Sequence, residues 1–454
     1  MASPMFPLVE DVIGRILTFC PDFATLHAVV LASKQFHAVY QTHPKSITQA
    51  VAYNIVGPAL PAALRVLRYP SRDINEDSSD PLTVTSVCVE ESSASIITWD
   101  EKMQLVKNAE EIAVLEDIYS IKFKSRHSRT SVLTPEESHR FQRAAYRAEL
   151  FSAIFPADTW SVDDIDELDS VAISNIQEQR AALLNVYDTR ELLELFSFVR
   201  FMRAILKGIV AAERHIDILL TAGPTRILEA WEDDIGWDSS NADTPNRLFD
   251  GYYARAFAKH KDILNPPTED DGGSAARWLL SDVPEVNDTC SHCLTRGGLE
   301  LLTEANWHLH PISQRSLGRL KSRLTNNSTL FDPVNKAVAV AGTTAVRLVD
   351  VDFTPRGPSL FIFWGGWISA VFDFAQTAGQ SEFASWTKDQ SYCVPCLGRF
   401  LDENVWRWLL AERVKEGWVP PEDCWYGYNC RTQVHKYTHA TTKNHLAVPT
   451  RGDE

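Results

Sequence analysis

The sequence lacks any hydrophobic run long enough to cross a membrane as a helix. Its longest apolar stretch, residues 359–372, falls short of the roughly 20 apolar residues that a spanning helix needs, and it contains two glycines. The first residues also lack the basic start and unbroken apolar core of a secretory signal. We therefore expect a soluble intracellular protein, in the cytoplasm or the nucleus, with no membrane partner.

The chain also lacks an excess of basic residues. It holds 60 acidic and 44 basic side chains, and its formal net charge is −16. That sign opposes DNA or an anionic membrane as a partner for the surface as a whole, because attraction to phosphate needs a positive potential. Residues 424–451 differ, since they carry no acidic side chain, and any anion-binding role is expected there. Their basic residues are Arg431, Lys436, Lys443 and Arg451.

Signatures of common enzymes are missing as well. The chain contains no G-x-G-x-x-G, no P-loop, no G-x-S-x-G and no H-E-x-x-H. We therefore expect a protein that is not an enzyme, and we infer no small-molecule substrate. With 44% apolar and 23% charged residues, the composition is typical of globular proteins.

Helical periodicity dominates what is present. Short strands are expected only at 83–89 and 94–99, so the predicted fold class is mainly α, with minor β. The predicted architecture is a helical body with an N-terminal helical bundle and a small Cys/His zinc-stabilised module at the C-terminus. Apolar residues recur at helical spacing in residues 9–20, 23–40, 44–53, 61–67, 134–155 and 176–220.

The length of 454 residues suggests two or three folding units, or one large unit with appendages. Turn-rich and acidic stretches near 71–81, 158–169 and 265–274 read as loops. The predicted parts are a helical region at 1–45, a helical body at 46–280, a tryptophan-rich region with two C-x-x-C knuckles at 281–415, and a zinc module with its tail at 416–454.

Six of the eight cysteines occur in three close pairs. Thiols stay reduced inside a cell, so paired thiols there point first to metal. The densest group of ligand-type residues suits tetrahedral zinc, and Gly427 between its thiols allows a tight turn. His435 is an alternative third ligand. The predicted ligands of this first site are Cys424, Cys430, His439 and His445.

The other two pairs each have the two-residue gap of a zinc knuckle. Together they predict a second zinc site with four thiolates. Two alternatives stay open: the first pair could use His308 or His310, and the second pair could share the metal of the terminal site. The predicted ligands of the second site are Cys290, Cys293, Cys393 and Cys396.

The run from Cys424 to Cys430, with its following arginine and His-x5-His pair, resembles the poly(ADP-ribose)-binding zinc finger, or PBZ. The resemblance implies zinc at the terminal site, with Tyr426 as a base-stacking residue. The interval from Cys430 to His439 is two residues longer than in that family, and Arg431 replaces an aromatic. The anion-binding residues it suggests are Tyr426, Arg431, Lys436 and Lys443.

The N-terminal segment FPLVEDVIGRILTFCPDFATLHAVVLASKQFHAVYQTHP resembles an F-box. A bundle this short leaves apolar surface for a partner. The resemblance implies docking on the linker subunit of a cullin ubiquitin ligase, through Pro7, Ile13, Ile16 and Leu17. The joint layout is similar to that of a group of uncharacterised fungal proteins. We expect a substrate adaptor of such a ligase or, alternatively, a reader of poly(ADP-ribose) and nucleic-acid damage.

Overall fold

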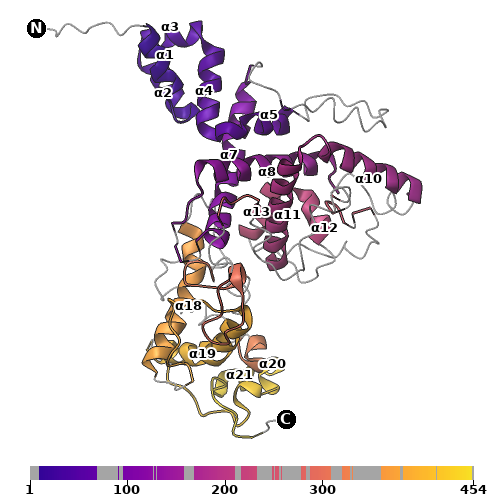
Figure 1. Ribbon diagram of the computed structural model, residues 1–454. Coiled ribbons are helices and arrows are strands. Elements are labelled where there is room, and N and C mark those ends of the chain that lie inside the picture. Colours follow the sequence, from indigo (N-terminus) through magenta and orange to yellow (C-terminus); the bar gives the residue numbers. More distant parts are fainter. Residues whose placement is uncertain are drawn as a thin grey trace, which may run out of the picture. The chain divides into compact units, whose positions relative to one another are not determined.

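A computed structural model provides the fold (Figure 1). It describes residues 10–68, 90, 96–125, 127–128, 130–157, 168–209, 216–232, 248–249, 251–254, 257, 278–282, 287–307, 320–327, 330, 359–378, 382–415 and 417–451. Pro7, His308 and His310 lie outside these residues, as does the strand expected at 83–89.

The chain is mainly helical, as the sequence predicted. Among the described residues there is no strand, and the minor β structure consists of isolated bridges that pair Thr289 with Arg296, Leu302 with Tyr392, and Asp423 with Asn444. The strand expected at 94–99 is wrong in its described part. Residues 96–98 have no regular structure, and helix α7 (Trp99–Phe123) begins directly after them.

A capping box explains why α7 begins at that point. The Thr98 hydroxyl accepts a hydrogen bond from the backbone N–H of Glu101, and the Glu101 carboxylate accepts one from the backbone N–H of Thr98, at 3.3 and 2.6 Å. This reciprocal pair satisfies two backbone donors that a helix start otherwise leaves without partners. The Thr-x-x-Glu spacing is visible in the sequence and outweighs the β propensity of the residues before it.

The described contacts divide the chain into two units. Unit 1 comprises Met1–Glu116, Leu133–Glu269 and Ser274–Ser281, and unit 2 comprises Asp117–Val132, Asp270–Gly273 and Asp282–Glu454.

Unit 1 begins with a bundle of four short helices: α1 (Glu10–Thr18), α2 (Phe23–Ala32), α3 (Lys34–Thr42) and α4 (Pro44–Val56). The helical run predicted for 23–40 is two helices. Ser33 separates them, because its extended backbone ends α2 and its hydroxyl accepts a hydrogen bond from the Gln35 N–H at the start of α3. The bundle core contains Ile13, Leu17, Cys20, Leu26, Val30, Val39, Ile47 and Val51.

Two residues that the F-box resemblance assigned to a partner face are core residues. Ile13 and Leu17 are 2% and 0% exposed. They lie four residues apart on the side of α1 that packs within the bundle, so their side chains are not available to a partner in this structure. Ile16, on another side of the helix, is 40% exposed.

One helical stretch among the described residues, Pro44–Arg68, is long and apolar enough to span a membrane. In its most apolar window, 56% of the residues are buried within the structure. It consists of α4, a 3-10 turn (Gly57–Ala59) and α5 (Leu60–Arg68), and Gly57 has a positive φ of 71° that ends α4. This burial is the pattern of a core element.

The rest of unit 1 is built on α8 (Pro135–Ile154), which packs against α5 and α11 (Thr189–Ile209). The predicted helix start is confirmed, because Thr134 and Glu137 form a capping box with Pro135 in the first turn. The other elements are α10 (Ser170–Leu184), α12 (Ile216–Leu219), η4 (Leu220–Ala222) and α13 (Pro224–Glu232).

Unit 2 combines two long helices with short turns. Helix α18 (Ser359–Thr377) packs beside α19 (Val394–Lys415), and Figure 1 shows the small C-terminal helices close to α19. The shared core is rich in aromatic residues, including Trp307, Phe372, Trp386 and Phe400. The shorter elements are η7 (Gly298–Glu300), η10 (Ser322–Asn326), η12 (Gly427–Asn429), α20 (Thr432–His435) and α21 (Tyr437–Thr442).

Candidate metal centres

The four cysteines of the two knuckles come together in unit 2. Their sulfur atoms all lie within 4.8 Å of one another, and the group could hold a metal ion. The Cys293 and Cys393 sulfurs are 3.7 Å apart. That distance is too long for a disulfide bond of about 2.05 Å. It matches the roughly 3.8 Å that separates two sulfurs on a tetrahedral zinc, given zinc–sulfur bonds of about 2.3 Å.

Backbone hydrogen bonds join the two knuckles despite their separation in sequence. The Leu302 and Tyr392 backbones exchange two hydrogen bonds of 2.7 and 2.9 Å, and the Ser291 N–H donates to the Ser391 carbonyl at 2.8 Å. The first knuckle turns through Leu294, whose φ of 60° lies in the left-handed region. This strain is tolerated where the surrounding structure holds the turn.

The second knuckle stands at the start of α19. Cys393 precedes the first residue of the helix and its carbonyl accepts from the Leu397 N–H, while Cys396 lies in the first turn. The N-terminus of a helix carries partial positive charge, which stabilises nearby thiolates. At these two sulfurs the helix terminus opposes the burial that raises the pKa of both thiols.

The thiols of this cluster have different environments. Cys290 and Cys396 are buried, whereas Cys293 is exposed. The hydroxyl and backbone N–H of Thr295 lower the pKa of Cys293 to about 6, and burial raises the pKa of Cys396. Thr295 is a residue that the cysteine spacing did not single out. Its position two residues after Cys293 is the signal that could have identified it.

The predicted terminal ligands also converge. The ligand atoms of Cys424, Cys430, His439 and His445 lie within 4.8 Å of one another, and they too could hold a metal ion. The His439 Nε2 atom is 3.7 Å from the Cys424 sulfur and 3.4 Å from the Cys430 sulfur. Tetrahedral zinc with bonds of about 2.3 Å to sulfur and about 2.0–2.1 Å to nitrogen places such atoms about 3.5 Å apart.

His445 provides independent support for a metal. Its side chain is buried at 2% exposure, and neither ring nitrogen has a partner at normal hydrogen-bond geometry. The backbone of Lys443 acts in the direction that raises the pKa of the ring. Burial, together with the nearby His439, lowers the pKa of His445 to about 4. The imidazole is therefore neutral near pH 7. A metal ion binds the neutral form of imidazole, so this buried ring suits a metal ligand.

Gly427 makes the turn between Cys424 and Cys430 possible. Its φ is +38°, and a Cβ atom at this position would lie 2.0 Å from the carbonyl oxygen of Ala447. The Gly427 N–H donates to the Cys424 carbonyl at 2.8 Å, and the Cys430 N–H donates to the Gly427 carbonyl at 3.2 Å. Only glycine fits this close approach, as the sequence suggested.

The segment that carries the terminal site, residues 422–451, is called the terminal module below. It packs on the rest of unit 2. Leu446 belongs to the same buried core as Cys290 and Cys396, and the ring of Tyr428 lies 5.6 Å from that of Trp406 on α19. The hydrophobic core that includes Cys290 and Cys396 therefore extends to Leu446, the neighbour of the terminal ligand candidate His445.

The open questions about ligands have structural answers for the described residues. His435 is exposed and is not part of the terminal cluster. The knuckle cysteines group with each other and not with the terminal pair. Asn444, which precedes His445, was missed: its amide donates to the Asp423 carboxylate at 2.7 Å and its side-chain oxygen accepts from the Leu446 N–H, so it orients the ligand segment.

The predicted anion-binding residues lie on the surface of the terminal module with one exception. Tyr426 is 49% exposed, and Arg431 and Lys436 are also exposed. Lys443 is half-buried and forms an ion pair with Glu422 at 2.5 Å, so part of its charge is already neutralised. Glu422 lies two residues before Cys424, outside the basic segment 424–451, so the sequence of that segment does not show this ion pair.

Comparison of the chain with family models, with curated proteins and with solved structures found no match.

Proposed function

We propose that the chain is a non-enzymatic interaction protein with two structural zinc ions. In this proposal the N-terminal bundle docks on the linker subunit of a cullin ubiquitin ligase, as the F-box resemblance implies, and unit 2 is the zinc-stabilised part that recognises a further partner. The observation that carries the docking role is an exposed apolar row along α1. Its members Val12, Ile16 and Phe19 are 44%, 40% and 76% exposed.

The row has the spacing of one helix face. Positions i, i+4 and i+7 fall on the same side of a helix, and the Phe19 N–H still donates to the Arg15 carbonyl at 3.1 Å, which continues the last turn. Large apolar side chains grouped on a surface favour a protein partner. The docking face proposed here therefore consists of Val12, Ile16 and Phe19, and not of Ile13 and Leu17.

Zinc is the proposed metal because of the chemistry of the donors. Thiolate and imidazole ligands in tetrahedral spacing are typical of zinc. Each cluster supplies four protein ligands, which fill a tetrahedral coordination shell and leave no position for a substrate. Both ions are therefore proposed to be structural.

Co-purification of the full chain with the recombinant linker subunit tests the docking role. We expect association with the unmodified chain, loss of association with Phe19→Asp, and retention with Val171→Asp. Val171 is a matched control because it is an apolar residue of unit 1 with 63% exposure outside the bundle. Failure of the unmodified chain to associate, or equal binding by Phe19→Asp, would contradict the proposed docking face.

Metal analysis of the purified chain tests the zinc assignment. We expect two zinc ions per chain, and one after either Cys393→Ser or Cys430→Ser, since each substitution removes a ligand from a different cluster. A different metal, or no bound metal, would contradict it.

A second candidate function is recognition of poly(ADP-ribose) by the terminal module. The exposed aromatic surface favours it: Trp425 and Tyr426 are 57% and 49% exposed beside the basic residue Arg431. Exposed aromatic rings can stack on bases while cations contact phosphates. We expect the full chain to bind the polymer with an affinity that falls with salt. Unchanged binding by Tyr426→Ala and Arg431→Ala would exclude this function.

A further inference from the structure

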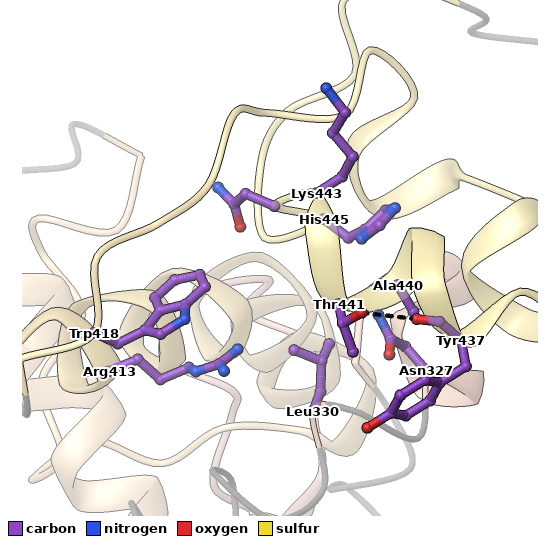
Figure 2. Close-up of a pocket in the computed structure, with 10 residues that line it drawn as sticks. Asn327, Leu330, Arg413, Trp418, Tyr437, Ala440, Thr441, Lys443 and His445 are labelled. Carbon is purple, nitrogen blue, oxygen red and sulfur yellow. Dashed lines mark hydrogen bonds between the residues drawn. The ribbon is translucent and has the colours of Figure 1, made fainter.

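A polar cavity of about 280 Å³ lies between the terminal module and the C-terminal end of α19 (Figure 2). Arg413 and Trp418 form one side of it, and α21 and the segment that follows it form the other. None of the described lining residues is acidic. They are Asn327, Leu330, Arg413, Trp418, Tyr437, Ala440, Thr441, Lys443, Asn444 and His445.

Arg413 supplies the positive charge on the α19 side. Its guanidinium lies 4.1 Å from the centre of the Trp418 indole ring. The backbone N–H of Trp418 donates to the Arg413 carbonyl at 2.9 Å. Figure 2 shows the guanidinium extending from beneath Trp418 toward Leu330. Stacking on an aromatic face holds the planar guanidinium in one orientation, and its N–H groups match the geometry of a phosphate.

The opposite wall is built from polar groups that the terminal module holds in place. The Thr441 hydroxyl donates to the Tyr437 carbonyl at 3.1 Å, a bond drawn in Figure 2, and the Asn327 amide donates to Gln433 at 2.9 Å. His445 contributes to this wall and belongs to the terminal metal cluster. The shape of the cavity therefore depends on the folded, metal-bound form of the module.

Lys443 adds a second cation at the rim. Its ammonium group is paired with Glu422, which is not among the lining residues. The pair is partly screened by solvent, because the Glu422 side chain is 75% exposed. Among the described lining residues, Arg413 and Lys443 carry positive charge and none carries negative charge.

We propose that this cavity binds the phosphate group of a small phosphorylated metabolite of mononucleotide size, with Arg413 as the main charged donor. The cavity lies just below the usual range for ligand pockets, roughly 300–1,000 Å³, and this size favours a single small molecule over a polymer. The aromatic rings of Trp418 and Tyr437 at the edges suit a planar ring beside the phosphate. Tyr426 and Arg431 take no part, so the proposal is independent of poly(ADP-ribose) recognition.

Isothermal titration calorimetry of the full, zinc-loaded chain tests the proposal. The probes are AMP, inorganic phosphate and adenosine. We expect saturable binding of AMP, weaker binding of phosphate and none of adenosine, because the phosphate group supplies the charge. Saturable binding of adenosine that equals that of AMP, or no binding of either AMP or phosphate, overturns the proposal.

Two substitutions at the end of α19 separate direct contact from general charge. Arg413→Gln should weaken AMP binding at least about tenfold, since it removes a charge-assisted hydrogen bond. Lys415→Gln removes the same charge from a residue that does not line the cavity and should leave the affinity within about twofold. Equal effects of the two substitutions, or no effect of Arg413→Gln, overturn the assignment of Arg413.

Two further measurements keep the test independent of folding defects. Zinc content shows whether each variant retains the terminal module. If Arg413→Gln loses zinc, Arg413→Lys decides the matter, because it keeps the charge without the fork-shaped donor and should bind AMP more weakly than the unmodified chain while it retains zinc. Unaltered AMP affinity in Arg413→Lys then counts against the proposal.

Discussion

Unit 1 and unit 2 stabilise their cores by different means. Unit 1 packs long helices such as α8 and α11, which have 20 and 21 residues, and places a network of ion pairs between them. Unit 2 also has long helices, α18 and α19, with 19 and 22 residues, but the segments around its terminal cluster are short: α20 and α21 have 4 and 6 residues. Helices of that length are not stable by themselves, so they are held by the core and by the two groups of metal-binding residues. In the terminal module, a group of residues that could hold a metal ion therefore takes the place of helix length as the source of local order.

Removal of the metal should cause the largest loss of stability, and it should separate unit 2 from unit 1. A structural zinc site contributes on the order of 10 kcal/mol to folding, so a strong chelator should unfold unit 2 and leave unit 1 helical. Limited proteolysis with mass spectrometry should then show cleavage within residues 282–454 and protection of α8 and α11. Continued protection of the C-terminal residues after complete loss of metal would show that the hydrophobic core of unit 2 is sufficient without it.

Disruption of the ion-pair network should destabilise unit 1 and leave the metal content of unit 2 unchanged. Arg147 is buried at 5% exposure, bonds to Glu90 and Glu191, and lies 4.0 Å above the Tyr187 ring. Arg147→Ala removes a buried cation from the half-buried carboxylates of Glu90 and Glu191 and should cost about 3 kcal/mol, measured by chemical denaturation.

Zinc content should be unchanged in Arg147→Ala, since the substitution lies in unit 1. Arg190 provides the control. Its side chain is 74% exposed beside Glu194, so Arg190→Ala should cost less than about 1 kcal/mol. Similar losses for the two variants would mean that burial adds nothing to the network.

Gly427→Ala should damage the terminal cluster alone. The new Cβ atom would lie 2.0 Å from the Ala447 carbonyl oxygen, whereas a Cβ atom at Gly417 meets nothing within 4 Å despite a φ of +92°. Gly427→Ala should therefore cost about 2 kcal/mol more than Gly417→Ala. It should also lower the zinc content from two ions to one, as measured by elemental analysis. Two retained zinc ions would show that the turn can relax.

The smallest expected effect concerns Glu149 of α8, whose carboxylate accepts hydrogen bonds from the Thr225 backbone N–H and hydroxyl at 3.2 Å. Burial raises the pKa of Glu149 from 4.5 to about 7. A raised pKa means that the folded state binds the proton more tightly, so unit 1 gains stability as the pH falls from above 7 toward 4.5.

Glu149→Gln should remove this pH dependence. Between about pH 8 and about pH 5.5 the unmodified chain should gain up to about 2 kcal/mol relative to the variant. Thermal or chemical denaturation of both proteins at the two pH values measures the difference. A parallel pH dependence in the two proteins would show that the carboxylate stays hydrated and charged in unit 1.

The metal clusters were predictable because their information is local and chemical. Cysteine and histidine are few, and their close spacing predicted the eight residues that the structure gathers into two groups able to hold a metal ion. The start of α8 at Thr134 was predictable for the same reason, since a capping box is read from four consecutive residues. The start of α7 had the same signal at Thr98 and was missed in favour of a strand.

The faces of α1 show what local sequence patterns do not determine. Ile13, Ile16 and Leu17 are similar side chains within five positions, and the sequence does not say which of them meets the other helices of the bundle. Tertiary packing decided that Ile13 and Leu17 are buried and that Ile16 is exposed. The apolar pattern predicts that a helix has a buried face, but the width and direction of that face depend on its neighbours.

The sequence by itself determined the helical class, the close pairs of candidate metal ligands and the turn at Gly427, because propensity, ligand chemistry and steric demand act over a few residues. Only the tertiary structure decided that the two knuckles, with 99 residues between Cys293 and Cys393, form one group and that the core around Cys290 and Cys396 extends to Leu446. It also placed Arg413 and His445 on one cavity. These arrangements depend on long-range packing, which brings together residues whose separation in sequence carries no signal of their contact.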